Sequence, residues 1–135
     1  DDVIDHSDLR RSKPSINKIW GTHFAVLCGD YLFARAFGIL SGSRLLKSLD
    51  LMVESIENMC QGEIFQADDK FNCNAGIDEY YGRIARKTAI FLQNCCKSGA
   101  VISGAGETEV KALGDFGINV GYAYQIIDDI MDFYG

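Results

Sequence analysis

Two short acidic motifs carry the side chains of this sequence that are most suited to chemistry. DDVID occupies residues 1–5 and DDIMD occupies residues 128–132, so each has two aspartates, two apolar residues and a third aspartate. On a helix with 3.6 residues per turn, the outer aspartates of each motif lie about 40° apart and the middle one flanks them. The three carboxylates therefore share one helix face, whereas the apolar residues point into packing.

Carboxylates gathered on one face need a partner of opposite charge. Like charges four residues apart destabilise a helix by about 0.2–0.5 kcal/mol per pair. A hard divalent cation offsets this repulsion, and Mg2+ typically binds one or two carboxylates together with substrate phosphates. We therefore predict Mg2+ at two groups, named here the first triplet (Asp1, Asp2 and Asp5) and the second triplet (Asp128, Asp129 and Asp132). One such motif alone is typical of a solvated helix face, but two copies favour the metal.

Basic and amide side chains accompany both triplets. Arg10 and Arg11 follow the first triplet, and planar guanidinium groups are suited to diphosphate recognition. Lys87, with Thr88 beside it, lies within a helical stretch among apolar residues, where an ammonium group needs a partner. Gln125 lies one helical turn before the second triplet and so on its acidic face. Acidic triplets with nearby cations indicate a metal-bridged diphosphate.

The elements that must position these residues are predicted to be helices. Helical apolar spacing is present over residues 19–46, 78–101 and 107–134, and a further helix is expected to begin with Ser48 as its N-cap and to fade at 68–74. We expect residues 1–8 to be the last turns of a helix and residues 9–17 to be a polar, basic loop. Strand alternation of useful length is absent from the sequence. The predicted fold class is therefore all-α.

Composition excludes several classes of function. The chain has 135 residues and a formal net charge of −6, and this acidic balance argues against nucleic-acid binding. Five cysteines occur without a CxxC pair, which favours free thiols and a cytoplasmic location over a zinc site. The most apolar stretch, residues 24–40, contains Asp30 and Arg35 and is expected to fall short of a membrane span. We therefore expect a soluble protein without a transmembrane segment.

Six motifs in chain order carry a family resemblance. DDVID, LRRSKPSIN, GDYLFA, GEIFQ, KTA and YQIIDDIMDF resemble the trans-polyprenyl diphosphate synthase family, in particular its medium- and long-chain branch. The resemblance implies an all-α bundle of the isoprenoid synthase type around a central cavity, usually dimeric, with the two aspartate motifs facing each other across the cavity mouth. Residues 1–135 would be the central part of a single isoprenoid synthase domain, truncated at both ends.

The resemblance implies a reaction and a role for each triplet. The reaction is the Mg2+-dependent, head-to-tail condensation of isopentenyl diphosphate with an allylic diphosphate, giving a trans-polyprenyl diphosphate such as a quinone side-chain precursor. The first triplet would bind the ions that clamp the allylic diphosphate. In the second triplet, Asp128 would hold a further ion, whereas Asp129 and Asp132 would act mostly through water or hydrogen bonds.

The same resemblance implies roles for the residues around the triplets. Arg10 would contact the allylic diphosphate, and Arg11 would help to bind isopentenyl diphosphate. Lys87, with Thr88 beside it, would support the allylic diphosphate from the opposite wall. Gln125 would stabilise the charge near the reacting carbons. Catalysis would then need neither a histidine nor a nucleophilic cysteine.

The chain departs from the family pattern in two residues and lacks three segments. Ser12 stands where glycine usually follows the arginine pair, and Tyr124 stands where phenylalanine usually precedes the glutamine. The upstream Gly-Lys-x-Arg segment with its histidine, the residues before the first motif that set product length, and the basic segment after the second motif are not in this chain. We therefore expect this fragment alone to be inactive. The implied assembly is a homodimer, with a heterodimer as the alternative and peripheral membrane contact for product release.

Three other functions are weighed against this one. A class I terpene cyclase shares the first motif but usually carries an N-x-x-x-S/T-x-x-x-E second site, so DDIMD argues against it. A non-catalytic subunit of a heteromeric synthase should show degenerate motifs, whereas these are intact. A structural helical domain with acidic ends would bind no diphosphate in the presence of Mg2+.

Glycines and aromatic residues admit both structural and functional interpretations. Gly29 and Gly62 are interpreted as points of close helix contact, because the absence of a side chain lets two helices approach. Aromatic residues at helical spacing are more often core than the lining of a product tunnel. This group contains Phe33, Phe37, Tyr80, Tyr81 and Phe91.

Overall fold

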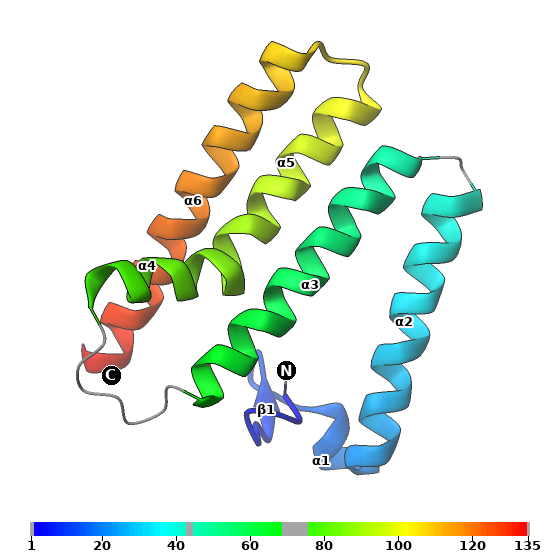
Figure 1. Ribbon diagram of the computed structural model, residues 1–135. Helices are drawn as coiled ribbons and strands as arrows, with labels where there is room; N and C mark the ends of the chain where they lie inside the picture. The colour runs from blue at the N-terminus through cyan, green and yellow to red at the C-terminus, as the bar shows by residue number, and fades with distance from the viewer. Residues whose placement is uncertain (1, 43–44, 69–75, 135) are drawn as a thin grey trace. The chain divides into compact units, whose positions relative to one another are not determined.

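The computed structural model describes residues 2–42, 45–68 and 76–134, in two compact units over residues 1–44 and 45–135. Each unit is described by itself. Helices dominate both units, which confirms the all-α prediction, and that these units form one domain stays a prediction (Figure 1). The elements are β1 (Leu9–Arg10), β2 (Lys13–Pro14), α1 (Ile16–Trp20), α2 (Thr22–Gly42), α3 (Leu46–Asp68), α4 (Ile77–Ile84), a π-helix (Ala85–Ala89), α5 (Ile90–Ile102) and α6 (Glu107–Tyr134).

The N-terminal unit differs from its prediction in three places. Residues 2–6 form turns rather than a helix, with His6 at a φ of 52°. A helical segment this short has few hydrogen bonds to offset the cost of its first turn, and its aspartates repel one another. Residues 9–17 are not a loop, because β1 and β2 pair as a hairpin and α1 begins at Ile16. The helix expected from residue 19 is divided at Gly21, whose φ of 85° favours glycine.

Helix α2 is the most apolar element of the N-terminal unit. None of its residues is buried. By length and composition alone, α2 is apolar enough to cross a membrane, so on these two criteria the expectation that this stretch falls short of a span is wrong. The helix predicted to reach residue 46 is described as far as Gly42, residues 43–44 lie outside the described part, and Leu46 already belongs to α3. The interpretation of Gly29 as a close helix contact is not supported, because a Cβ there would meet nothing within 4 Å.

The C-terminal unit is built on α3, α5 and α6. Helix α3 is described as far as Asp68, and the predicted fading over residues 69–74 lies outside the described residues. The helix begins before Ser48, since the amide of Leu49 donates to the carbonyl of Leu45. Ser48 is therefore an interior residue, 3 % exposed, and the N-cap prediction is wrong. The helix predicted over residues 78–101 is present as three consecutive helical elements, α4, the π-helix and α5. The expected helix 107–134 is confirmed as α6.

Glycines bring α6 close to α5, and the two helices lie side by side (Figure 1). Gly114, Gly117 and Gly121 are all buried along one face of α6. A Cβ at Gly117 would lie 2.7 Å from the carbonyl oxygen of Leu92, and a Cβ at Gly121 would overlap the backbone of Ala89. Larger residues at these positions would force the helices apart, so the glycines fix the distance between α6 and the π-helix.

A buried asparagine joins α5 to α3. Asn94 is 2 % exposed, and its Nδ2 donates to the carbonyl oxygen of Leu51 at 3.2 Å and to Ser55 Oγ at 3.2 Å. Nearer the π-helix, a Cβ at Gly62 would lie 3.1 Å from the amide nitrogen of Lys87. The close contact predicted for Gly62 is therefore confirmed, and α3 is held against the segment that carries Lys87.

Candidate functional site

The π-helix directs two neighbouring site residues to different helices. Lys87 turns to α3, where its Nζ lies 3.2 Å from Glu63 Oε1 and donates to Gln66 Oε1 at 3.1 Å. Thr88 turns to α6, where its Oγ1 donates to Gln125 Oε1 at 2.7 Å. Short π-helical segments that interrupt α-helices are frequent at functional sites. The segment ARKTA thus places a cation and a hydroxyl on two walls of the same unit.

Gln125 continues this contact toward the second triplet. It lies one turn after Gly121 on the packed face of α6 and is 9 % exposed. Its Nε2 donates to Asp129 Oδ1 at 2.9 Å. The other oxygen of that carboxylate, Oδ2, accepts the Tyr80 hydroxyl at 2.8 Å. Thr88, Gln125, Asp129 and Tyr80 therefore form one continuous hydrogen-bonded chain across the π-helix, α6 and α4.

The hydrogen-bonded chain includes only one of the three aspartates of the second triplet. Asp129 is half-buried and receives a donor on each oxygen, whereas Asp128 and Asp132 are exposed and stand four residues apart on α6. Within the described residues, no three His, Cys, Asp or Glu side chains form a group that could by itself hold a metal ion. Two exposed carboxylates nevertheless fit Mg2+, which commonly binds one or two protein carboxylates and completes its shell with water and phosphate.

Tyr80, at the end of the hydrogen-bonded chain, is held in its protonated form. Partial burial, the hydrogen bond to Asp129 and the negative charge of that carboxylate raise the pKa of Tyr80 from 10.0 to about 12. At neutral pH its hydroxyl therefore carries the proton that it donates. The ring is held by Tyr81, whose ring centroid lies 5.7 Å away, and by the Arg83 guanidinium, 5.7 Å from the Tyr80 ring centroid.

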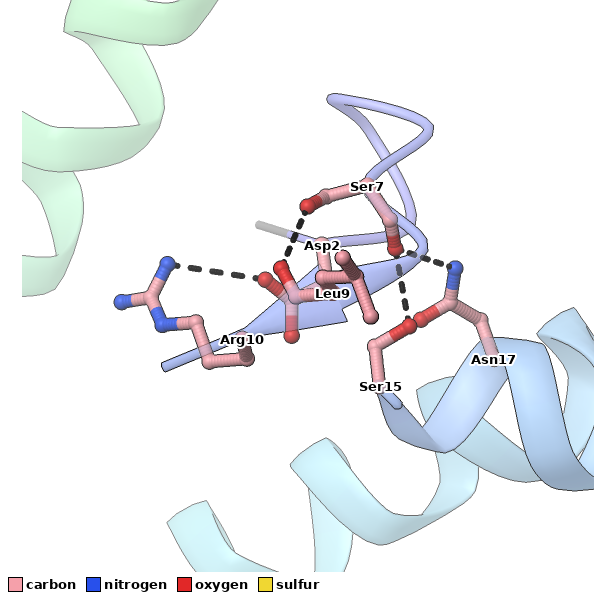
Figure 2. Close-up of polar contacts among 6 residues, drawn as sticks. All are labelled: Asp2, Ser7, Leu9, Arg10, Ser15 and Asn17. Carbon is pink, nitrogen blue, oxygen red and sulfur yellow. Dashed lines mark hydrogen bonds and ion pairs between the residues drawn. The ribbon is translucent and has the colours of Figure 1, made fainter. Parts of the chain in front are cut away.

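The described members of the first triplet are held by a different kind of structure, the turn that leads into the hairpin. Asp1 lies outside the described residues. Asp2 Oδ1 lies 3.5 Å from Arg10 Nη1 (Figure 2). Asp5 is exposed. Arg11 is exposed in the two-residue turn of the hairpin, where its φ is 49°. The structure thus brings Asp2 and Arg10 together and leaves Asp5 and Arg11 at the surface.

Backbone carbonyls fix the path of this acidic segment. The carbonyl oxygen of Ser7 accepts the Ser15 hydroxyl at 2.8 Å and the Asn17 amide at 3.1 Å (Figure 2). The amide of Ser15 donates to the carbonyl of Asp8 at 3.0 Å. The hairpin and the start of α1 therefore fold back on residues 7–8 and hold the turn that carries Asp2 and Asp5.

Three contacts of the site were missed by sequence reasoning. Tyr80 is counted there only as an aromatic residue, and Glu63 and Gln66 belong to the GEIFQ motif without a role of their own. The need of Lys87 for a partner was a signal, but sequence alone does not identify the helix that supplies one. Tyr80 lies 49 residues before Asp129 in the sequence, so only the packing of α4 against α6 brings the two together.

This chain matches the family described as Polyprenyl synthetase over residues 1–135. It is 42% identical to heptaprenyl diphosphate synthase component 2 of Geobacillus stearothermophilus, and the match covers 100% of this chain and 42% of the relative. The chain therefore spans less than half of that relative's length.

Solved structures share the fold. The decaprenyl diphosphate synthase of Rhodobacter capsulatus matches with a TM-score of 0.94 at 35% identity, over 99% of this chain and 41% of that one. A polyprenyl synthase of Caulobacter crescentus CB15, complexed with calcium and isoprenyl diphosphate, matches with a TM-score of 0.94 at 36% identity, over 99% and 41% of the two chains.

Proposed function

The chain belongs to the polyprenyl synthetase family, as its motifs predicted, and we propose that it is the central part of an enzyme that condenses isopentenyl diphosphate with an allylic diphosphate. The observation that carries this proposal is the hydrogen-bonded chain from Thr88 through Gln125 to Asp129. Asp129 directly follows the exposed Asp128 in the sequence. This arrangement supports a reaction in which a diphosphate leaves and a carbocation forms, since the site offers carboxylates for a metal and oxygen atoms for a cation.

The leaving group is the first need of this reaction. Mg2+ bound at the exposed carboxylates of the two triplets would neutralise the departing diphosphate and so favour cleavage of the carbon–oxygen bond. Arg10 and Lys87 add positive charge for that diphosphate, and Arg11 does so for isopentenyl diphosphate. Lys87 is held by Glu63 and Gln66, so its ammonium is positioned in advance rather than mobile on its long side chain.

The allylic cation is the second need. Thr88 gives its only proton to Gln125, so the lone pairs of its oxygen are left to face a positive charge. Gln125 in turn gives an N–H to Asp129 and keeps one lone pair of its own oxygen. Preorganised oxygen dipoles of this kind stabilise charge without reorganising during the reaction. The new carbon–carbon bond then forms from the isopentenyl double bond, and a proton is lost to the departing diphosphate.

The test uses the full-length protein that contains this chain. Asp128→Ala should lower incorporation of radiolabelled isopentenyl diphosphate by about 100-fold or more, because a metal-binding carboxylate is lost. Asp115→Ala is the matched control: this aspartate is exposed on the same helix and pairs only with Lys111 within the described residues. Equal activity of the Asp128 and Asp115 variants would overturn the proposed function.

The product is proposed to be a medium- or long-chain polyprenyl diphosphate of the kind that forms quinone side chains. The names of the relatives support this, since they include heptaprenyl, solanesyl and decaprenyl diphosphate synthases. Chromatography of the products of the full-length enzyme, after removal of the diphosphate, tests the length. Products with seven or more isoprene units are expected, and a three-unit product would refute the assignment.

The assembly is proposed to be a homodimer, and one observation favours a second arrangement. The Geobacillus relative is named as a component, which supports a heteromeric synthase in which this chain belongs to the subunit with the intact triplets. Activity of the purified full-length protein by itself supports the homodimer. Activity that appears only when a second subunit from the same genome is added supports the heteromer.

The enzyme is proposed to be cytoplasmic and to contact membranes only peripherally when it releases its product. Cys28, Cys60, Cys95 and Cys96 are free thiols, which supports a reducing compartment. The exposed apolar residues of α2 offer a surface for a partner subunit or a membrane. Cell fractionation tests the location: recovery in the membrane fraction after a high-salt wash would contradict it.

A further inference from the structure

We propose that Tyr80 is a positioning residue of the prenyl transfer site, which acts through Asp129 to fix the orientation of the Gln125 amide. The inference rests on the proposed function and assigns a role to a residue outside both triplets. Its basis is the pair of hydrogen bonds on Asp129, from the Tyr80 hydroxyl at 2.8 Å and from Gln125 Nε2 at 2.9 Å.

The directions of the hydrogen bonds determine how the Gln125 amide is oriented. An ionised carboxylate only accepts hydrogen bonds, so Asp129 requires a donor from each neighbour. Gln125 must therefore present its NH2 group to Asp129, which leaves its carbonyl oxygen toward Thr88. Thr88 must then donate, and it does so at 2.7 Å. Tyr80 and Gln125 thus donate to the carboxylate and Thr88 donates to Gln125, so the remaining oxygen lone pairs of Thr88 and Gln125 are left for the substrate.

Tyr80 is the end of the chain that keeps Asp129 in place. A carboxylate one residue after Asp128 and three before Asp132 can turn toward a cation bound by them, because the carboxylate is charged and its side chain rotates. The Tyr80 hydroxyl occupies Oδ2 from α4 and so opposes this rotation, while Oδ1 stays with Gln125. Without the hydroxyl, Asp129 loses one of its two anchors, and the Gln125 amide loses its fixed partner.

The tyrosine itself is well held, which a positioning residue requires. Its ring packs edge-on against Tyr81, which packs in the same way on Tyr122 of α6, and Arg83 lies over its face. Helices α4 and α6 therefore share an aromatic cluster that fixes the ring without the hydroxyl. The hydroxyl is left free to act on Asp129, and its removal should leave the ring packing unchanged.

The test compares two tyrosine variants of the full-length enzyme. Tyr80→Phe should lower kcat for isopentenyl incorporation about tenfold, the value of one hydrogen bond to a charged group. The KM values and the Mg2+ concentration for half-maximal activity should stay within about twofold, because Asp128 and Asp132 are untouched. Tyr81→Phe is the matched control, since the Tyr81 hydroxyl makes no hydrogen bond within the described residues. Equal kcat values for the two variants would overturn the proposal.

A double-mutant cycle separates positioning from a merely structural role. If Tyr80 acts through Asp129, the variant with both Tyr80→Phe and Asp129→Asn should be no slower than Asp129→Asn alone. Fully additive losses would contradict the proposal, as would a loss of activity that follows a lower folded fraction in thermal denaturation. If Tyr80→Phe does not fold, Asp129→Asn decides: unchanged kcat in that variant would also overturn the inference.

Failure of this inference can be told from failure of the proposed function. If the wild-type enzyme does not incorporate isopentenyl diphosphate, the proposed function fails, and the orienting role of Tyr80 in prenyl transfer fails with it. If the wild-type enzyme is active and Tyr80→Phe equals wild type, only the positioning role fails.

Discussion

The two aspartate triplets have the same spacing but are held by different means. The second triplet lies on a 28-residue helix whose glycines are buried against the π-helix and α5, and its middle carboxylate receives two side-chain donors. Asp2 and Asp5 of the first triplet lie on turns, which hydrogen bonds to the backbone carbonyls of residues 7 and 8 tie to the following hairpin and helix. Sequence spacing defines a set of ligands, whereas tertiary packing decides how rigidly they are presented.

This difference predicts which substitutions should disturb each triplet. The second triplet should respond to changes in helix packing several residues away, because helix contacts set the distance between Thr88 and Gln125. The first triplet should respond to single hydrogen bonds in its own turn. Preorganised sites are the ones whose supporting contacts matter as much as their ligands.

The largest expected effect is that of Gly121→Ala. A Cβ at this position overlaps the backbone of Ala89, so α6 must move away from the π-helix. We expect a loss of about 3 kcal/mol in unfolding free energy and nearly complete loss of isopentenyl incorporation, since Gln125 moves with α6. Thermal denaturation and the incorporation assay on the full-length protein measure both effects.

Gly99→Ala is the matched control for that substitution. Gly99 is exposed inside α5, and a Cβ there meets nothing within 4 Å. Alanine is favoured over glycine in a helix, so the free energy of unfolding of this variant should rise by about 0.5–1 kcal/mol and its activity should be kept. If Gly121→Ala is as stable and active as Gly99→Ala, the second triplet does not depend on glycine packing and the contrast between the triplets is wrong.

A smaller effect is expected on the first triplet from Ser15→Ala. Ser15 is 3 % exposed, and its hydroxyl donates to the Ser7 carbonyl, which also accepts from Asn17. Because the hydrogen bond from Asn17 remains, the free energy of unfolding should fall by only about 1 kcal/mol. We expect faster amide hydrogen exchange in residues 2–8 and about a fivefold higher Mg2+ concentration for half-maximal activity.

Ser103→Ala is the control for this loss of a hydroxyl. Ser103 Oγ donates to the Gly99 carbonyl at 2.8 Å in an exposed position at the end of α5. Its removal should leave the Mg2+ requirement unchanged. Unchanged hydrogen exchange in Ser15→Ala would show that the hairpin does not hold the first triplet.

Particular residues show how far sequence reasoning reaches. The start of helix α6 is predicted because small residues precede Glu107, and its described course to Tyr134 follows an uninterrupted amphipathic pattern. Gln125 is placed correctly on the acidic face of that helix, since a fixed period connects it to the triplet. Local periodicity is sufficient where one helix carries the whole relation.

The rest of the site depends on relations between helices. The π-helix that separates Lys87 from Thr88 carries no glycine or proline, so the sequence continues there as an ordinary helix. From this segment Thr88 contacts Gln125 of α6 and Lys87 contacts Glu63 of α3, and tertiary packing supplies both partners. Residues 2–6 show the opposite error, because a helical spacing of aspartates does not by itself make a helix.

The pH dependence of Tyr80 tests the polar chain of the second triplet. An unfolded tyrosine ionises near pH 10.0, whereas Tyr80 in the folded protein ionises at about 12. Its contribution to stability is therefore complete below about pH 10 and is lost as the pH rises through 12. The tyrosinate absorbance of wild type minus that of Tyr80→Phe should show this late step. A step near pH 10.0 would mean that Asp129 does not hold the hydroxyl.

The smallest expected effect concerns the turn of the hairpin beside the first triplet. Ser12 adopts a φ of 62° and Arg11 a φ of 49°, in a two-residue turn where the pairing of Arg10 with Lys13 requires positive φ. Serine is strained there, by about 1 kcal/mol, and glycine is not. Ser12→Gly should therefore stabilise the protein by about 0.5 kcal/mol after the greater chain entropy of unfolded glycine is subtracted.

A control substitution at a serine with ordinary backbone geometry tests whether Ser12→Gly raises stability by relieving strain. Ser103 has a φ of −75°, so Ser103→Gly gains no relief of strain and should only lose stability. Thermal denaturation of both variants measures the difference, and a loss of stability in Ser12→Gly equal to that in Ser103→Gly would contradict a strained turn. The gain should come without a change in the second triplet, because Ser12 belongs to the hairpin alone. A change in kcat that matches Tyr80→Phe would show that the two triplets are not held independently.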